Sequence, residues 1–126
     1  MKNFLFLLSA LFSMAACYTP PANCADFKTG TFQYQTYVNG ELIQAKIVRN
    51  DSLEIDYYDP QHPDTSQIRW INDCEYVLKK YKPKGTSEKR AFSMRIMETK
   101  GNTYKFLFSE IGQKETKEFN ATRIKE

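Results

Sequence analysis

Residues 30–47, which read GTFQYQTYVNGELIQAKI, decide the fold. Apolar and polar side chains alternate before the turn, so Phe32 and Tyr34 share one face of a strand. Asn39-Gly40 is a strong hairpin signal, because a type I′ turn needs positive φ at both central residues. The return strand alternates in the same way and places on its inner face Ile43, Ala45 and Ile47. The stretch therefore predicts an antiparallel hairpin with one buried face.

The same two-residue rhythm continues to the C-terminus, interrupted by polar, glycine or proline turns. The predicted inner rows are Leu53, Ile55 and Tyr57; Ile68 and Trp70; Cys74, Tyr76 and Leu78; Phe92, Met94 and Ile96; and Tyr104, Phe106 and Phe108. A last strand is expected over 116–124. The pattern predicts an all-β domain, an antiparallel up-and-down meander of about eight strands that is either a closed barrel or an open curved sheet.

The first 17 residues have the order of a secretory signal peptide. A basic start precedes an apolar run from Phe4 to Phe12, which is shorter than the ~20 residues of a spanning helix. Ala15-Ala16 before Cys17 then resembles a bacterial lipobox. The resemblance implies that residues 1–16 are removed and that Cys17 is acylated by a fatty acid such as palmitate. An ordinary cleaved signal with a chance cysteine is the alternative.

The chain is therefore expected to have three parts. They are the signal peptide 1–16, an acylated cysteine with a proline-containing spacer over 17–26, and a β-domain over 27–126. Removing 16 residues from 126 leaves 110, which suits one small core. Tyr18 stands where lipoproteins kept at the inner membrane carry aspartate. By that resemblance the expected location is the outer membrane, facing the periplasm.

Two cysteines remain if Cys17 carries lipid. Cys24 and Cys74 form an even pair, and in an oxidising envelope we expect a disulfide between them. Two separate buried thiols are the alternative. Neither cysteine has the neighbours of a zinc site.

The charge balance argues against a nucleic-acid partner. The chain has 18 basic side chains, of which Lys2 lies in the leader, against 15 acidic ones. A nucleic-acid binder needs a strongly basic face. One basic run, Lys79–Lys84 with Lys89 and Arg90, could contact anionic headgroups or polysaccharide. More often such a run is a soluble hairpin tip that blocks edge pairing.

No group of residues has the spacing of a catalytic centre. His62 is the only histidine, and we interpret the loop that it shares with Asp59 and Asp64 as solvated. Glu54 and Asp56 alternate with apolar residues and are expected to be ordinary outward groups. The sequence therefore predicts no catalytic residue, no metal site and no cofactor, and a protein that is not an enzyme.

Aromatic residues on the predicted inner faces are candidates to line a ligand cavity. They are Phe32, Tyr34, Tyr57, Trp70, Tyr76, Phe106 and Phe108. An eight-stranded barrel encloses room for side chains or for one small ligand. We expect a mostly filled interior.

Two segments resemble known families. Gly30-Thr31-Phe32 near the first strand, with Arg123 near the last, is similar to the lipocalin and calycin pattern, with Phe32 in place of tryptophan. The resemblance implies a lipocalin-like barrel whose floor is closed by Arg123 against Phe32 through a cation–π contact. The segment from Trp70 to Tyr76, after Thr29–Phe32, resembles small uncharacterised lipoproteins of Bacteroidota-type bacteria, which implies no particular chemistry.

Together these features favour a non-catalytic, lipid-anchored envelope lipoprotein with a binding or accessory role. Its N-terminal lipid would be its link to the membrane. One alternative is a lipocalin-like carrier of a small apolar ligand. The other is a structural or assembly factor that docks on another envelope protein.

Overall fold

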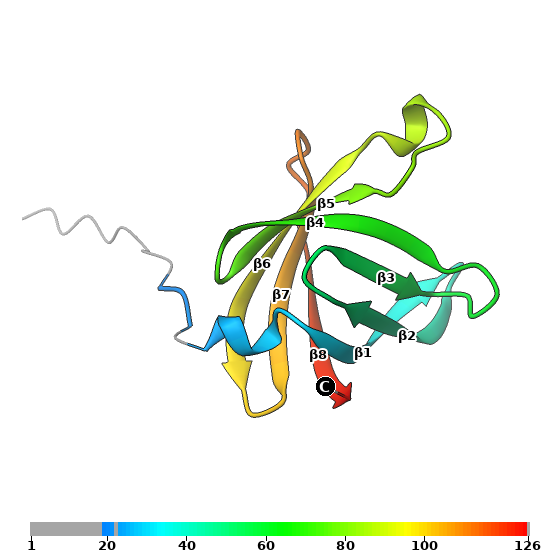
Figure 1. The fold of residues 1–126 in the computed structure, drawn as a ribbon. Helices are drawn as coiled ribbons and strands as arrows, with labels where there is room; N and C mark the ends of the chain where they lie inside the picture. The colour runs from blue at the N-terminus through cyan, green and yellow to red at the C-terminus, as the bar shows by residue number, and fades with distance from the viewer. Residues whose placement is uncertain (1–18, 22, 126) are drawn as a thin grey trace, which may run out of the picture.

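The Asn39-Gly40 turn joins strands β1 (Gly30–Val38) and β2 (Glu41–Arg49), with positive φ at both turn residues, as predicted. The computed structural model describes residues 19–21 and 23–125; the predicted leader and Cys17 lie outside this part. All eight strands are antiparallel and close into an up-and-down barrel (Figure 1), which confirms the predicted fold class. The other strands are β3 (Leu53–Tyr57), β4 (Asp64–Asn72), β5 (Glu75–Lys80), β6 (Ala91–Lys100), β7 (Thr103–Glu110) and β8 (Lys117–Lys125).

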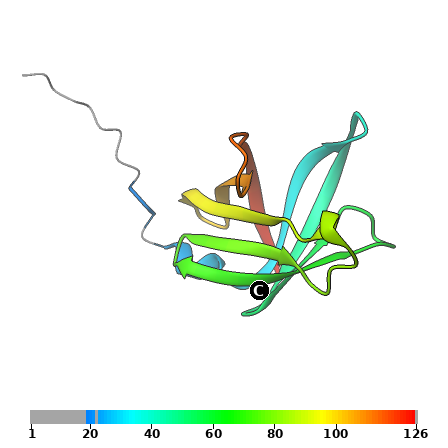
Figure 2. The ribbon, with the colours of Figure 1, turned by 90° about the horizontal axis from the view of Figure 1, so that it is seen from above.

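The connections gather at two opposite ends of the barrel, because each strand reverses the direction of the one before it (Figures 1 and 2). The closed end carries the turns 50–52, 73–74 and 101–102 together with the 3₁₀ helix η1 (Cys24–Phe27). The open end carries the connections 39–40, 58–63, 81–90 and 111–116. The connection 81–90 includes a second 3₁₀ helix, η2 (Thr86–Glu88).

The seam between β1 and β8 closes the barrel. Its cross-strand pairs are Thr31 with Lys125, Phe32 with Arg123 and Gln33 with Thr122. The pairing ends at Gln33, so the tip of the β1–β2 hairpin projects past β8 at the open end (Figure 2). The barrel is therefore closed most firmly near η1.

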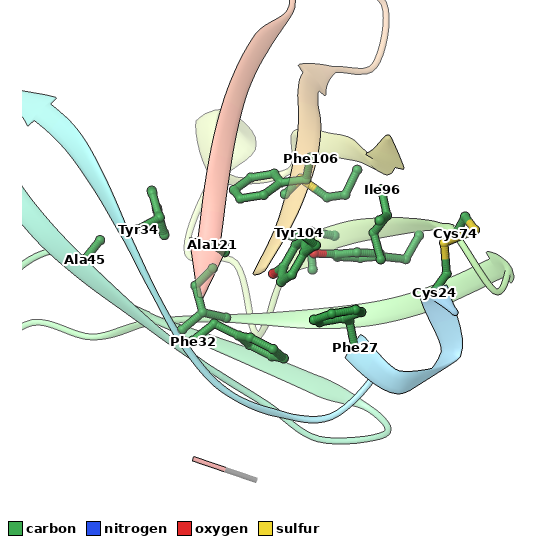
Figure 3. Packing of buried hydrophobic residues seen from close by; sticks show 14 residues of the cluster. Cys24, Phe27, Phe32, Tyr34, Ala45, Cys74, Ile96, Tyr104, Phe106 and Ala121 are labelled. Carbon is green, nitrogen blue, oxygen red and sulfur yellow. A yellow bond between two sulfur atoms is a disulfide. The ribbon is translucent and has the colours of Figure 1, made fainter. Parts of the chain in front are cut away.

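A disulfide between Cys24 and Cys74 fastens η1 to the turn between β4 and β5, as predicted (Figure 3). The Cα atoms are 5.1 Å apart and both cysteines are buried. The bridge spans 50 residues, and cross-linking a loop of that size stabilises a fold by about 4 kcal/mol in the chain-entropy model. The spacer predicted over 17–26 thus ends in the core, because Cys24 is part of it.

Arg123 seals the seam against η1. Its guanidinium carbon lies 5.2 Å from the ring centre of Phe32 and 5.5 Å from that of Phe27. The guanidinium donates hydrogen bonds to the backbone oxygens of Thr29 and Asp26. Gly30 has φ +134°, and a Cβ there would lie 2.7 Å from a nitrogen of Arg123, so only glycine leaves room for this contact.

A second arginine, Arg49, is sealed inside the barrel just above η1. Its Nε donates to Glu54 Oε2 at 2.7 Å, and Nη1 donates to the backbone oxygen of Phe27 at 2.7 Å. Nη2 donates to the hydroxyls of Tyr76 at 2.7 Å and Tyr104 at 3.0 Å. Arg49 and Glu54 are 2% and 1% exposed, so this ion pair is screened from water.

Aromatic rings complete the closed end around this guanidinium. The carbon of the Arg49 guanidinium lies 5.0 Å from the ring centre of Phe32 and 4.9 Å from that of Tyr76. Figure 3 shows Phe27, Phe32 and Tyr104 packed together, with the ring of Tyr104 tilted against Phe27 and edge-on to Phe32. Burial works to lower the pKa of Arg49, but Tyr104, Tyr76 and Glu54 outweigh it and raise the pKa above its ordinary value. The guanidinium therefore stays charged.

Replacing Arg49 by methionine should lower the free energy of unfolding by about 3–5 kcal/mol, because Glu54 is left buried without its partner. The double variant Arg49→Met with Glu54→Leu should recover most of that loss, since no charge is then stranded. Urea denaturation with the disulfide intact measures both.

Lys105→Met is the matched control. Lys105 pairs with Glu98 at 3.5 Å on the exposed surface, so its loss should change the stability by no more than about 1 kcal/mol. An equally small effect for Arg49→Met would contradict the role given to the buried pair.

Candidate functional site

A cavity of about 170 Å³ occupies the open half of the barrel, above the Arg49 cluster. Its apolar wall comes from strands on all sides of the barrel. The residues of this wall are Ile47, Leu78, Met94, Phe106, Phe108 and Phe119. The aromatic members are closely packed, with the rings of Phe106 and Phe119 5.5 Å apart. The cavity is thus lined chiefly by hydrocarbon.

A second set of lining residues brings polar atoms to this cavity. They are Tyr34, Thr36, Glu54, Asp56, Tyr58 and Lys117. Tyr58 and Lys117 are exposed and stand at the mouth, whereas Glu54 is buried at the base. Apart from Lys117, the polar side chains that line the cavity therefore present oxygen atoms, and aromatic rings surround them.

Strand β3 faces the opposite way from its predicted orientation. Cross-strand partners share a face, and Arg49 pairs with Glu54 while the fully buried Ile47 pairs with Asp56. Glu54 and Asp56 therefore point into the barrel, and the prediction that they are outward surface groups is wrong. The physical reason is Arg49, whose buried guanidinium requires the Glu54 carboxylate on the inside.

The apolar residues of β3 lie outside as a consequence. Leu53, Ile55 and Tyr57 are half-buried on the outer face. Tyr57 lies beside Lys46, whose Nζ is 4.5 Å from its ring centre. The prediction that Tyr57 lines a cavity is therefore wrong.

The carboxyl group of Asp56 is a half-buried acid on the wall of the cavity. Within residues 19–21 and 23–125 it has no hydrogen bond or ion pair. Burial, the neighbouring carboxylate of Glu54 and that of Asp64 raise its pKa well above the ordinary value, and Arg49 opposes them only in part. Arg49 gives its hydrogen bonds to other groups, which leaves Asp56 with no cation in contact.

Two tyrosines flank Asp56. The rings of Tyr34 and Tyr58 meet edge to face with centres 6.3 Å apart. Burial and the nearby carboxylate of Asp56 raise the pKa of Tyr58 to about 12. Burial, Tyr58 and Asp56 also raise the pKa of Tyr34 above its ordinary value. Both hydroxyls keep their protons at neutral pH and can donate or accept hydrogen bonds.

The other aromatic residues expected at a cavity divide between the two halves of the barrel. Tyr34, Phe106 and Phe108 line the cavity. Phe32 and Tyr76 instead fill the closed end, where they surround Arg49. The interior is thus filled in its closed half and hollow in its open half.

Trp70 belongs to the wall of the closed end. Its ring centre is 4.5 Å from that of Tyr76, and Nζ of Lys28 lies 5.1 Å from its ring centre. Trp70 is half-buried and does not line the cavity.

Sequence reasoning missed the contributions of Arg49, Asp56, Tyr58 and Phe119. One signal was available for Arg49, because it continues the inner row of Ile43, Ala45 and Ile47 at the same spacing. An arginine at an inward position requires an inward acid, and Glu54 follows directly across the next turn.

The remaining sequence features lie apart from the cavity wall. His62 Nδ1 is 2.7 Å from Asp59 Oδ2 in an exposed loop, whereas Asp64 pairs with Lys80. Across the described ranges no group of three or more metal-ligating side chains occurs. The connection 81–90 at the open end holds most of the basic run, and its lysines and Arg90 are exposed. No helix in the described part of the chain has the length and apolar character to cross a membrane.

Asp56 should make stability depend on pH. Its pKa is raised in the folded state, so folded protein holds a proton that the unfolded chain has already released, and stability falls as pH rises through this range. Asp56→Asn has no carboxyl group to ionise at this position, so the variant should not show this fall in stability. We expect the variant to gain stability relative to wild type as pH rises, with no pH-dependent difference below the ordinary aspartate pKa of ~3.9.

Urea denaturation at several pH values measures this difference. Asp51→Asn, the same change in the exposed turn between β2 and β3, serves as the control and should leave the pH profile unchanged. A profile of Asp56→Asn that runs parallel to wild type at every pH would show that Asp56 is an ordinary solvated acid.

Comparison of the chain with protein-family models, with curated proteins and with solved structures finds no match.

Proposed function

We propose that this chain is an exported, lipid-anchored envelope protein that binds one small, largely apolar molecule in the open half of its barrel. The observation that carries the proposal is a cavity of about 170 Å³ with aromatic walls, a sealed base and a mouth at one end. The signal-like order of residues 1–16 and the lipobox-like position of Cys17 support export and anchoring. A concave, mostly apolar pocket with a few polar groups is typical of small-molecule binding.

The size of the cavity limits the ligand. Pockets for drug-sized ligands measure about 300–1,000 Å³, and an enclosed cavity of about 150 Å³ holds one benzene. A cavity of about 170 Å³ therefore suits a body of roughly one ring and excludes a long acyl chain. This makes a long-chain lipid carrier the less favoured form of the carrier hypothesis.

The orientation of the two ends of the barrel fits a lipid anchor at residue 17. Thr19 and Pro20 lead into η1 at the closed end, where the chain enters the fold (Figure 1). An anchor there would hold the closed end towards the bilayer. The mouth, formed by the connections of the opposite end, would then face the periplasm, which suits capture of a soluble molecule.

Cells fed radiolabelled palmitate should incorporate label into the protein and lose it with Cys17→Ser. The acyl chain would be attached at that residue alone, so Cys24→Ser, which removes a disulfide partner, should keep the label. Label that persists in the Cys17→Ser chain, or a mature chain recovered from the cytosol with its leader intact, would contradict the anchoring.

Toluene should bind the full chain that carries Cys17→Ser, with saturation and a dissociation constant on the order of 1 mM, since one ring fills a cavity of this size. Heteronuclear NMR reports the site. The methyl signal of Met94, which lines the cavity, should shift through the ring current, and that of Met97 should not.

A pair of variants on β1 sharpens this test. Thr36→Phe places a ring in the cavity and should abolish toluene binding, whereas Gln35→Phe places one on the exposed outer face and should preserve it. Equal binding by both variants, or a bound lipid with a long acyl chain in native mass spectra, would contradict the proposal.

A further inference from the structure

The carboxyl group of Asp56 lines the cavity without a partner of its own. A half-buried carboxylate that accepts no hydrogen bond from the protein can still accept one from a ligand. The neighbouring acid shows the contrast, because Glu54 accepts hydrogen bonds from Arg49 at 2.7 Å and from Tyr76 at 3.3 Å. Asp56 therefore offers carboxyl oxygens that a ligand in the cavity can contact.

The other polar groups in the cavity are suited to a cation. Tyr34, Thr36 and Tyr58 bring hydroxyl oxygens, and Glu54 and Asp56 bring carboxyl oxygens. The nitrogens of Arg49 already donate to Glu54, Phe27, Tyr76 and Tyr104. This guanidinium therefore has no free pair of N–H groups for an anionic ligand. Lys117 is the one lining cation in the described chain, and it is exposed at the mouth.

The aromatic wall adds a second attraction for positive charge. Phe106, Phe108 and Phe119 line the cavity together with Tyr34. The faces of aromatic rings attract ammonium groups, and most strongly where water is excluded. The same rings also provide an apolar contact surface for the hydrocarbon part of a ligand.

We infer that the cavity binds an organic ammonium ion, a primary amine on an apolar body of about one ring, with the ammonium donating to the Asp56 carboxylate and the body against the phenylalanine wall. This inference rests on the proposed function and specifies its ligand class. A neutral hydrocarbon of the same shape would donate no hydrogen bond to Asp56, and an anion would meet two carboxyl groups.

The binding should depend on pH through Asp56. The groups that face this acid are Tyr34 on β1, Arg49 on β2, Glu54 on β3, Asp64 on β4, Tyr58 after β3 and Lys117 on β8. Their balance raises the pKa of Asp56. Amine affinity should therefore fall as pH is lowered through that pKa, because the acid becomes neutral. Asp56→Asn should remove the dependence.

The test compares benzylamine, toluene and benzoate, which share one ring and differ in charge. Titration calorimetry and the Met94 methyl signal follow each ligand with the full chain that carries Cys17→Ser. Benzylamine should bind at least about tenfold more tightly than toluene or benzoate, the size of a charge-assisted hydrogen bond. Asp56→Asn should lose that advantage and keep toluene binding, and Asp51→Asn should behave as the parent chain does.

Each other outcome has a distinct meaning. Toluene binding without a preference for benzylamine, or a preference that survives Asp56→Asn, would overturn the ammonium inference and leave the apolar cavity standing. Tighter binding of benzoate would overturn it as well. Failure of all three ligands to shift Met94 would overturn both this inference and the proposed function.

Discussion

A guanidinium enclosed in a barrel of this size is the constraint on which the rest of the structure depends. Arg49 cannot release its charge, and its burial is tolerated only because Glu54, Tyr76, Tyr104 and the backbone of Phe27 accept all its hydrogen bonds. Those acceptors come from η1, β3, β5 and β7, so one side chain joins four elements at the closed end. The disulfide and Arg123 then hold η1 over this cluster.

The same interaction creates the candidate site. Because Arg49 draws Glu54 inward, the alternation of β3 places Asp56 inside the barrel one step nearer the mouth. There the acid receives no hydrogen bond from Arg49 and lies beside a hydrocarbon wall. An acid that accepts no hydrogen bond from the protein, on the wall of a mostly apolar cavity, is suited to a binding function.

Much of the fold could be predicted from the sequence, and the orientation of β3 could not. The Asn39-Gly40 turn and the meander follow from turn chemistry and two-residue alternation. The Cys24–Cys74 pair follows from the even number of cysteines left when Cys17 is set aside. A strand of five residues shows which side chains share a face but not which face is inside, and Leu53, Ile55 and Tyr57 suggested the wrong one. How far side chains fill the barrel depends on packing between strands distant in sequence. The alternation of apolar and polar residues therefore could not predict the cavity.

The ionisation of Asp56, followed by NMR of its carboxyl carbon as pH is varied, tests this account most directly. The account predicts a midpoint well above the ordinary aspartate value of ~3.9, and a lower midpoint once benzylamine is bound, because the ammonium stabilises the carboxylate. An ordinary midpoint that benzylamine does not move would contradict both the inward orientation of β3 and the site derived from it.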